Sequence, residues 1–410
     1  MKGRGISPYV RRLDWMILAP VLLLVAFGLL AIFSATHNAE LIVKFQKQIF
    51  WAALGILSLL LVLLAPPRFF HYSAYLLYGA ALLLLSLVLV FGHTVSGNAG
   101  WFGIGGFGVQ PSEFAKIATI LALARYLSDR TTSLRSLPDI GKAIGIVALP
   151  WLLIFMQPDF GTGLVYWVFF ISMLFWSGAE MLLLIVMLSP VLVAVLAIID
   201  LWYFILATLV VAGLYYIVRR NLGFALIFFA FNLSIGFGVQ YAYEHLPAYQ
   251  KARIAVFIDP SQAPLSAGWN VIQSKVAVGS GGLFGKGYLQ GTQTQLRFVP
   301  EQWTDFIFCV PAEEFGFIGA VIILLLYGLL FIRGLVIAKN LELRFASLVV
   351  AGLVAMLAFH VVVSIGMSLG TIPVIGIPLP FMSYGGSFFI TSMVAIGIIL
   401  HAWMYRTGME

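Results

Sequence analysis

Glu113 and Lys116 are the first residues whose types and spacing could do chemistry, because both charges lie in a strongly apolar stretch near 112–128. Residues three apart share one face of a helix, so these two side chains can form an ion pair. A charge inside a membrane helix costs about 3 kcal/mol on insertion scales, which makes the pair a candidate for substrate binding. An ion pair that only holds two helices together is the alternative. Ser112 can cap this helix with its hydroxyl oxygen.

Asp159 is the second candidate, in the segment 157–163 that joins two apolar stretches. Pro158 is expected to end one helix, and Asp159 stands where its carboxylate can cap the next. A helix cap is the simpler interpretation of Asp159 taken alone, and a role in a polar site is the alternative.

Asp305 is the third candidate, directly before an apolar segment near 306–333 that we expect to cross the membrane. The helix dipole favours an acid at a helix N-terminus, so capping is again the alternative to a chemical role. Glu313 and Glu314 would then lie further along the same helix. Three acids so close together are more than capping requires, and they predict a water-accessible cavity that binds a polar group.

Residues 243–305 form a long loop rich in glycine and polar residues, and loops of this length are usually functional. Glycine lets backbone amides approach an anion, and lysine adds a mobile positive charge, so the loop is suited to phosphate. Its candidate binding residues are Gln273, Ser274, Lys275 and Lys286. A solvated surface loop is the alternative. Together with the nearby acids and lipid, the pattern indicates an amphiphilic, anionic lipid as substrate.

The composition indicates that membrane helices position these residues. Of the 410 residues, 62% are hydrophobic and only 10% are charged, whereas soluble domains carry about 25% charged residues. A soluble enzyme with one anchor, a disordered chain and a disulfide-stapled chain are therefore excluded, and the single Cys309 allows no internal disulfide.

Twelve apolar segments approach the length of about 20 residues that spans a bilayer. They lie near 15–35, 46–65, 70–92, 112–128, 139–156, 160–178, 181–199, 200–217, 222–242, 306–333, 344–369 and 382–404. We therefore expect an all-α polytopic membrane protein with about twelve transmembrane helices. Residues 1–410 would form a single integral membrane domain, with the loop 243–305 on its outer face.

Basic residues gather in alternate loops, and this sets the expected orientation. They are concentrated at the N-terminus, at Arg68, and in the loops near 125–142, 219–220 and 333–344. Positive loops stay on the cytoplasmic side, so both termini are expected in the cytoplasm. The formal net charge of +7 is accounted for by membrane insertion, and no nucleic-acid partner is needed.

Several motifs occur in the same order as in a known family of bacterial membrane proteins. They include Gln110-Pro111-Ser112-Glu113, Gln157-Pro158-Asp159, Gly268-Trp269-Asn270, Gln273-Ser274-Lys275, Thr304-Asp305-Phe306 and Ser383-Tyr384-Gly385-Gly386-Ser387. By these motifs nearly the whole chain resembles the SEDS family (shape, elongation, division and sporulation). The run 292–296 before Pro300 is similar to the RodA branch of that family and not to the division branch, FtsW.

The resemblance implies a peptidoglycan glycosyltransferase that polymerises lipid II at the outer face of the bacterial inner membrane during cell elongation. Its partners would be a class B penicillin-binding protein, which is a transpeptidase, and other membrane proteins of the elongation machinery. The family's essential acid matches Asp305, an important pair matches Glu113 and Lys116, and a further acid matches Asp159. The family core has about ten spans, so an extra pair of helices is expected within 160–242.

Two residues depart from the family pattern. Ser364 stands where the family often has asparagine, and Phe388 stands where a small residue is usual. These departures put in doubt any fine role for the helix near 344–369, although they leave the acid site untouched.

Joining two sugars with a lipid-pyrophosphate leaving group needs a base and a counter-charge. Asp305 is the hypothetical general base, and Lys116, Lys275 and Lys286 are candidates to offset the pyrophosphate. A divalent cation such as Mg²⁺, held by Asp305 or Asp159, could share that role, but the sequence shows no ligand set. A lipid II flippase or another polytopic transporter is the alternative function, followed by a non-catalytic scaffold for the transpeptidase.

Overall fold

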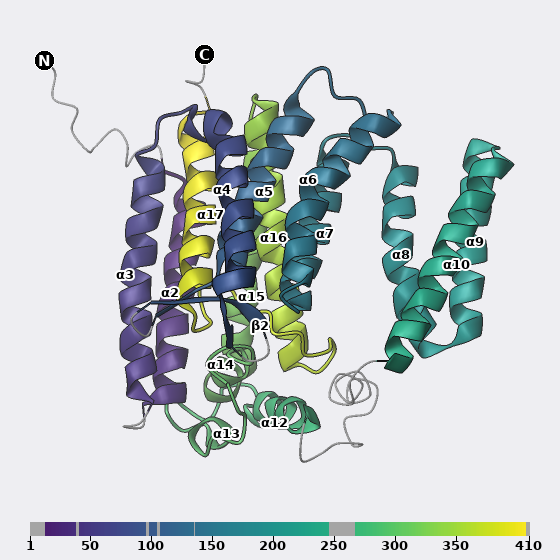
Figure 1. The fold of residues 1–410 in the computed structure, drawn as a ribbon. Helices are drawn as coiled ribbons and strands as arrows, with labels where there is room; N and C mark the ends of the chain where they lie inside the picture. Colours follow the sequence, from purple (N-terminus) through teal and green to yellow (C-terminus); the bar gives the residue numbers. More distant parts are fainter. Residues whose placement is uncertain are drawn as a thin grey trace, which may run out of the picture.

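The computed structural model describes residues 13–37, 41–95, 98–104, 107–134, 136–245 and 267–406. Its main body is a bundle of long helices that run roughly along one axis (Figure 1). The long helices are α2 (Trp15–Thr36), α3 (Ile42–Leu63), α4 (Phe69–Phe91), α5 (Pro111–Ser128), α6 (Leu137–Phe155), α7 (Phe160–Trp176), α8 (Met181–Ile199), α9 (Leu201–Arg219), α10 (Leu222–His245), α15 (Gly316–Asn340), α16 (Arg344–Ser368) and α17 (Gly386–Met404). A helix therefore lies at each of the apolar segments predicted from the sequence.

Ten of the helices in the described part of the chain are long and apolar enough to cross a membrane. The other two long helices are α5, which carries Glu113, Lys116 and Arg125, and α7, which has only 17 residues. The mostly helical membrane fold is confirmed, whereas twelve crossings remain a prediction.

Helices α16 and α17 form the centre of the bundle. In their most apolar windows 78% and 83% of the residues are buried, against 22% in α4. Small residues allow close packing here: a Cβ on Gly352 of α16 would lie 2.7 Å from the sulfur of Met173 in α7. Because both helices are enclosed by others, the ends of the loop between them are held firmly in place.

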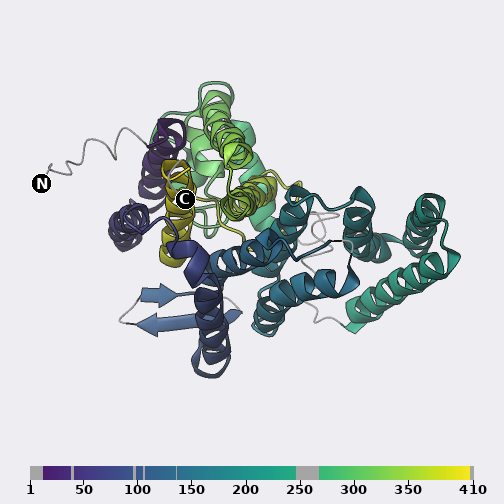
Figure 2. The same ribbon diagram turned by 90° about the horizontal axis from the view of Figure 1, so that it is seen from above.

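Helices α8, α9 and α10 stand to one side of the main bundle (Figure 2). They have a small core of their own, made by Val193, Ala197 and Phe204. The buried Ser189 hydroxyl donates a hydrogen bond to Oδ1 of Asn232 across α8 and α10, over 3.1 Å. The sequence predicted an extra pair of helices in this region, and the structure places three helices there that pack mainly on one another.

A small antiparallel sheet interrupts the helical fold between α4 and α5. Its strands β1 (His93–Val95), β2 (Asn98–Ile104) and β3 (Phe107–Val109) pair in sequence order. The all-α prediction missed this sheet, because short glycine-rich strands carry little periodic signal.

The chain before α15 differs from the prediction of a single helix over 306–333. Residues after Pro300 form turns, the short helix α14 (Cys309–Glu314) follows, and α15 begins only at Gly316. Gly316 has φ +65°, and a Cβ there would lie 2.3 Å from the Gly285 nitrogen, so the chain turns sharply where only glycine fits. Asp305 therefore lies in a turn, and the two glutamates lie before the membrane helix.

The predicted loop 243–305 contains ordered helices in its second half. These are α12 (Ala267–Ser280) and α13 (Thr292–Gln295), which lie with α14 at the end of the bundle opposite the start of α2 and the end of α17 (Figure 1). Residues 246–266 of this loop lie outside the described residues.

Candidate active site

The segment 369–385 between α16 and α17 holds the Asp305 turn. The Tyr384 amide donates to the Trp303 carbonyl oxygen over 2.8 Å, and the Ser383 hydroxyl donates to the Thr304 carbonyl oxygen over 2.7 Å. These two bonds fix the residues directly before Asp305, whose side chain is half-buried.

Gly376 lies opposite the Asp305 carboxylate. It has φ +73°, and a Cβ at this position would lie 3.9 Å from Oδ2 of Asp305. A side chain larger than alanine here would therefore crowd the carboxylate. The positive φ is one that glycine adopts readily and other residues adopt at a cost.

Asp159 caps α7, and it also links its own motif (157–159) to the motif 110–113 by a hydrogen bond. Its Oδ1 accepts a hydrogen bond from the Thr162 amide over 3.0 Å, which confirms the predicted cap. Its Oδ2 accepts from Nε2 of Gln110 over 2.9 Å. Gly161, two residues after Asp159, lies against the carbonyl oxygen of Ile375. A Cβ on Gly161 would be only 2.5 Å from that oxygen. Asp159 and Asp305 thus both lie beside the segment 369–385.

The start of α5 is attached to the start of α17. The Gln110 amide donates to the Ser387 hydroxyl oxygen over 3.0 Å. Gln110 is the N-cap residue of α5, and Pro111 occupies the first turn. The predicted capping role of Ser112 is wrong, because the helix begins before that residue.

Glu113 and Lys116 form the expected ion pair, with 2.8 Å between Oε2 and Nζ. Both side chains are buried, and Lys116 is only 1% exposed. Nζ also lies 3.1 Å from Nε2 of His360 in α16. An ammonium group has only donors, so Nε2 of His360 must accept this bond and the imidazole must be neutral. The ring of Phe388 lies beside both, 4.9 Å from the His360 ring.

Several polar atoms in this interior are buried without a hydrogen-bond partner. Among the described residues they include Ser112 Oγ, Tyr166 Oη, Ser364 Oγ and both side-chain polar atoms of Gln157. An unsatisfied buried polar group costs about 1–3 kcal/mol, so such groups normally bind water.

The contact of His360 with Lys116 gives this histidine a positioning role. We expect His360→Phe to lower the free energy of unfolding by about 1–3 kcal/mol, because a buried donor loses its acceptor. His360→Gln keeps an acceptor and should have a smaller effect. Denaturant unfolding of the detergent-solubilised variants measures the difference, and equal losses for both would contradict the hydrogen bond.

Lys286 was predicted to bind phosphate, whereas in the structure its ammonium group contacts side chains of the protein. Its Nζ is 2.8 Å from Oε1 of Glu313 and donates to the hydroxyls of Ser280 and Thr292, each over 2.7 Å. Glu313 also accepts hydrogen bonds from the Gln293 amide over 2.9 Å. The pair therefore fastens the loop of α12 and α13 onto α14.

The two glutamates of α14 are buried and anchor the loop, and the polar cavity expected beside them stays a prediction. Burial acts to raise the pKa of Glu313, but the hydrogen bonds from Lys286 and the neighbouring amides outweigh it and hold the pKa below its usual value. Burial raises the pKa of Glu314, which accepts hydrogen bonds from the Ser34 hydroxyl and the Leu289 amide. Both acids are thus used in tying the loop to α2 and α14.

Lys286→Met should destabilise the loop by about 1.5–3 kcal/mol, the range for hydrogen bonds to charged groups. Because the folded pKa of Glu313 is lowered, its contribution is complete above the unfolded pKa and is lost as pH falls through the lower folded value. The difference in melting temperature between wild type and variant should therefore shrink at acidic pH. Lys142→Met is the matched control, since Lys142 is 65% exposed and lies 3.6 Å from Asp139. An equal loss in the control would contradict the anchoring role.

The remaining loop candidates lie at the end of α16. The buried Ser274 hydroxyl donates to the Ser368 carbonyl oxygen over 2.8 Å, so it attaches α12 to α16. Lys275 is exposed, and its stem packs at Gly370, where a Cβ would lie 2.8 Å from Cδ. Gln273 is half-buried beside them. Among the lysines in the described part of the loop, Lys275 packs against the segment 369–385 at Gly370.

Two polar residues of α3 were missed by the sequence analysis. Gln48 is buried, and its Oε1 accepts from the Gly385 amide over 3.2 Å. Lys44 lies over the ring of Trp303, with 3.7 Å from Nζ to the ring centroid. Both stand out as polar residues at the start of an apolar stretch, which is the signal that could have identified them.

A metal site is not assembled by the residues that the structure describes. No group of three or more His, Cys, Asp or Glu side chains among them could hold a metal ion. Asp159 uses both carboxylate oxygens in hydrogen bonds to the protein, so its contacts are those of a cap and not of a ligand.

The chain is similar to known proteins over nearly its full length. The family described as "Cell cycle protein", which covers FtsW, RodA and SpoVE, matches residues 14–209 and 200–408. The peptidoglycan glycosyltransferase RodA of Treponema pallidum (strain Nichols) is 37% identical over 98% of each chain. The peptidoglycan glycosyltransferase MrdB of Escherichia coli (strain K12) is 36% identical over 96% of this chain and 94% of its own.

The chain is also similar in fold and sequence to chains of solved structures. A chain from a study of the "structural coordination of polymerization and crosslinking by a peptidoglycan synthase complex" has a TM-score of 0.74 at 32% identity, and the match covers 97% of this chain and 99% of that one. The rod shape determining protein RodA of Thermus thermophilus has a TM-score of 0.65 at 28% identity, covering 96% and 98%. This chain belongs to the FtsW, RodA and SpoVE family, the SEDS family that its motifs resemble.

Proposed function

We propose that this protein is a peptidoglycan glycosyltransferase that polymerises lipid II during cell elongation. The observation that carries the proposal is the gathering of Asp305, Asp159 and Lys275 around the segment 369–385. Relatives at 36–37% identity that are named peptidoglycan glycosyltransferases support it, because the match runs through all of these motifs.

The site lies at the end of the bundle away from the start of α2 and the end of α17 (Figure 1). The opposite end carries the basic loops, which insertion retains in the cytoplasm. We therefore place both termini in the cytoplasm and the site at the outer face of the bacterial inner membrane, where a lipid-linked sugar can reach it from the bilayer.

In the proposed reaction, the 4-hydroxyl oxygen of an acceptor sugar attacks C1 of the donor sugar. The bond from C1 to the pyrophosphate oxygen breaks, and the undecaprenyl pyrophosphate leaves with both bonding electrons. Asp305 takes the hydroxyl proton, which makes the oxygen a better nucleophile and is worth about 10²–10⁴-fold in rate. A single displacement of this kind inverts the configuration at C1.

The leaving pyrophosphate needs positive charge close to it. Lys275 is the preferred source, because it is exposed beside the segment 369–385. Lys116 is buried with Glu113, and Lys286 is paired with Glu313, so both hold other groups in place. Gln273 would contact the substrate beside Lys275, whereas Ser274 would support it through α16.

We further propose that the enzyme works with a crosslinking partner, a class B penicillin-binding protein, and with other membrane proteins of the elongation machinery. The similar solved chain comes from a complex that couples polymerization to crosslinking, which supports a partner of this type.

Incubation of the purified protein and its transpeptidase partner with labelled lipid II tests the proposal. Glycan strands longer than the substrate are expected on a gel. If wild-type protein forms the complex but makes no strands, the enzyme assignment is wrong. Movement of labelled lipid II across vesicles that contain this protein alone would instead indicate a transporter.

A further inference from the structure

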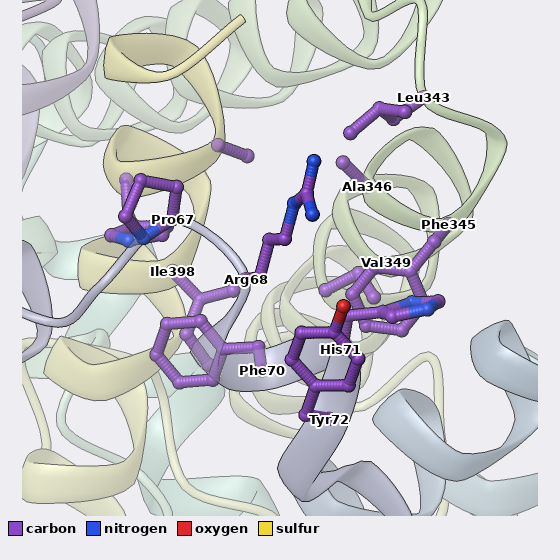
Figure 3. Close-up of a pocket in the computed structure, with 12 residues that line it drawn as sticks. Pro67, Arg68, Phe70, His71, Tyr72, Leu343, Phe345, Ala346, Val349 and Ile398 are labelled. Atoms are coloured by element: carbon purple, nitrogen blue, oxygen red, sulfur yellow. The ribbon is translucent and has the colours of Figure 1, made fainter. Parts of the chain in front are cut away.

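A pocket of about 280 Å³ is drawn in Figure 3, and the helix ends that form it lie at the end of the bundle opposite the proposed active site (Figure 1). It is formed where α4 begins, where α16 begins and near the end of α17. Its lining residues are Pro67, Arg68, Phe70, His71, Tyr72, Leu343, Phe345, Ala346, Val349, Ile398, His401 and Ala402. None of the proposed catalytic or substrate-binding residues is among them.

The walls of the pocket are fixed by aromatic contacts. The His71 ring meets Phe345 edge-on with centroids 4.9 Å apart, and the Phe70 ring meets His401 edge-on at 5.2 Å. Nε2 of His401 also lies 3.1 Å from the Ala65 carbonyl oxygen. The pocket therefore keeps an apolar, pre-formed wall, as binding sites for small molecules usually do.

The charge in the pocket is positive. The Arg68 side chain extends into it between the α16 and α17 walls (Figure 3). A second guanidinium adjoins it, because Nη1 of Arg125 donates to the His71 carbonyl oxygen over 2.7 Å. None of the twelve lining residues, all of which the structure describes, is acidic. An anionic group is thus attracted to this pocket.

The pocket opens to the surface of the protein, and exposed, largely apolar side chains line the opening. Tyr72 is 68% exposed and Leu343 is 41% exposed. The outer surface of α4 continues away from it with exposed apolar residues such as Leu76 and Leu83. A ligand held here would meet lipid on one side and arginine on the other.

We propose that this pocket binds the phosphate head group of an anionic glycerophospholipid from the adjacent leaflet. Basic pockets between transmembrane helices bind such head groups. The volume of 280 Å³ lies just below the range of about 300–1,000 Å³ for ligand pockets, so the pocket accepts a head group and glycerol but no acyl chains. The chains would lie along the exposed apolar surface of α4.

Lipid binding to the detergent-solubilised full chain tests the proposal without any measurement of enzyme activity. Phosphatidylglycerol and phosphatidylcholine are titrated separately, and bound lipid is counted by native mass spectrometry. Wild type should retain phosphatidylglycerol in preference to phosphatidylcholine. Arg68→Glu should weaken the phosphatidylglycerol complex about tenfold or more, because a charge near the phosphate is reversed.

Two further variants separate a specific site from general surface charge. Arg130→Glu reverses an exposed charge that does not line the pocket, and it should leave binding within about twofold of wild type, because screening weakens exposed charges at a distance. Ala346→Phe fills the pocket without changing charge and should weaken binding as Arg68→Glu does. Equal losses for Arg68→Glu and Arg130→Glu, or unchanged binding in Ala346→Phe with a wild-type melting temperature, would overturn the site.

The last arm distinguishes a lipid from a free phosphate. Glycerol 3-phosphate carries the same head-group chemistry without acyl chains, and it should neither raise the melting temperature nor displace the lipid at equal concentration. If it does so as well as phosphatidylglycerol does, the ligand is a soluble phosphate and the lipid assignment is wrong. Because every readout is binding, the result is independent of whether the protein polymerises lipid II.

Discussion

Asp305→Asn is expected to reduce glycan-strand synthesis by about 10²–10⁴-fold, the usual contribution of a general base. The amide has nearly the same shape as the carboxylate, so the turn held by Tyr384 and Ser383 should remain folded. What is lost is the group that accepts the proton of the attacking hydroxyl. Strand synthesis from labelled lipid II by the complex with its transpeptidase measures the effect.

Glu301→Gln is the matched control for this variant. Glu301 is an exposed acid in the same turn region, and its backbone carbonyl oxygen accepts hydrogen bonds from the Thr304 amide and hydroxyl. Its neutralisation should leave strand synthesis within about twofold of wild type, because an exposed charge is screened by solvent. Equal losses in both variants would mean that overall charge matters and that Asp305 is not the base.

Lys116→Met is expected to have the largest effect on stability, a loss of about 3–5 kcal/mol. The substitution leaves the buried Glu113 carboxylate without the ammonium that lies 2.8 Å from it. The double variant Glu113→Gln/Lys116→Met removes both charges and should regain most of that stability. Denaturant unfolding of the three proteins in detergent measures the coupling between the two positions.

Activity of the same variants decides between the two interpretations of the pair. Lys116 is 1% exposed, so we expect the ion pair to act by holding α5 and α16 in register and the double variant to recover activity with stability. A charge-swapped protein, Glu113→Lys/Lys116→Glu, provides a second comparison. If either double variant folds normally but stays inactive, the pair contacts the substrate directly and the structural interpretation is wrong.

Local sequence patterns predicted the helices and the contacts within them. Each apolar segment became a helix because a bilayer-length apolar run has one way to satisfy its backbone. The Glu113–Lys116 pair and the Asp159 cap were equally predictable, since each depends on residues three apart in one helix.

Contacts between segments that are far apart in the sequence could not be predicted from local patterns. Nothing in the spacing of residues indicates that the segment 369–385 lies against both Asp305 and Gly161. The pairing of Lys286 with Glu313 joins residues 27 apart in the sequence, and no local pattern indicates that they anchor the loop together. The turn at Gly316 was likewise missed, because the apolar residues before Glu313 and after Glu314 were interpreted as one continuous membrane helix.

The most direct test of the central claim is a single-turnover measurement with lipid II already bound. Wild type and Asp305→Asn are first titrated with lipid II, and bond formation is then followed at saturation, so that binding and chemistry are read separately. The account predicts that the two proteins bind lipid II within about threefold of each other and that the chemical step in Asp305→Asn is slower by about 10²–10⁴-fold. Equal rates of bond formation once the substrate is bound would contradict the assignment of Asp305 as the general base.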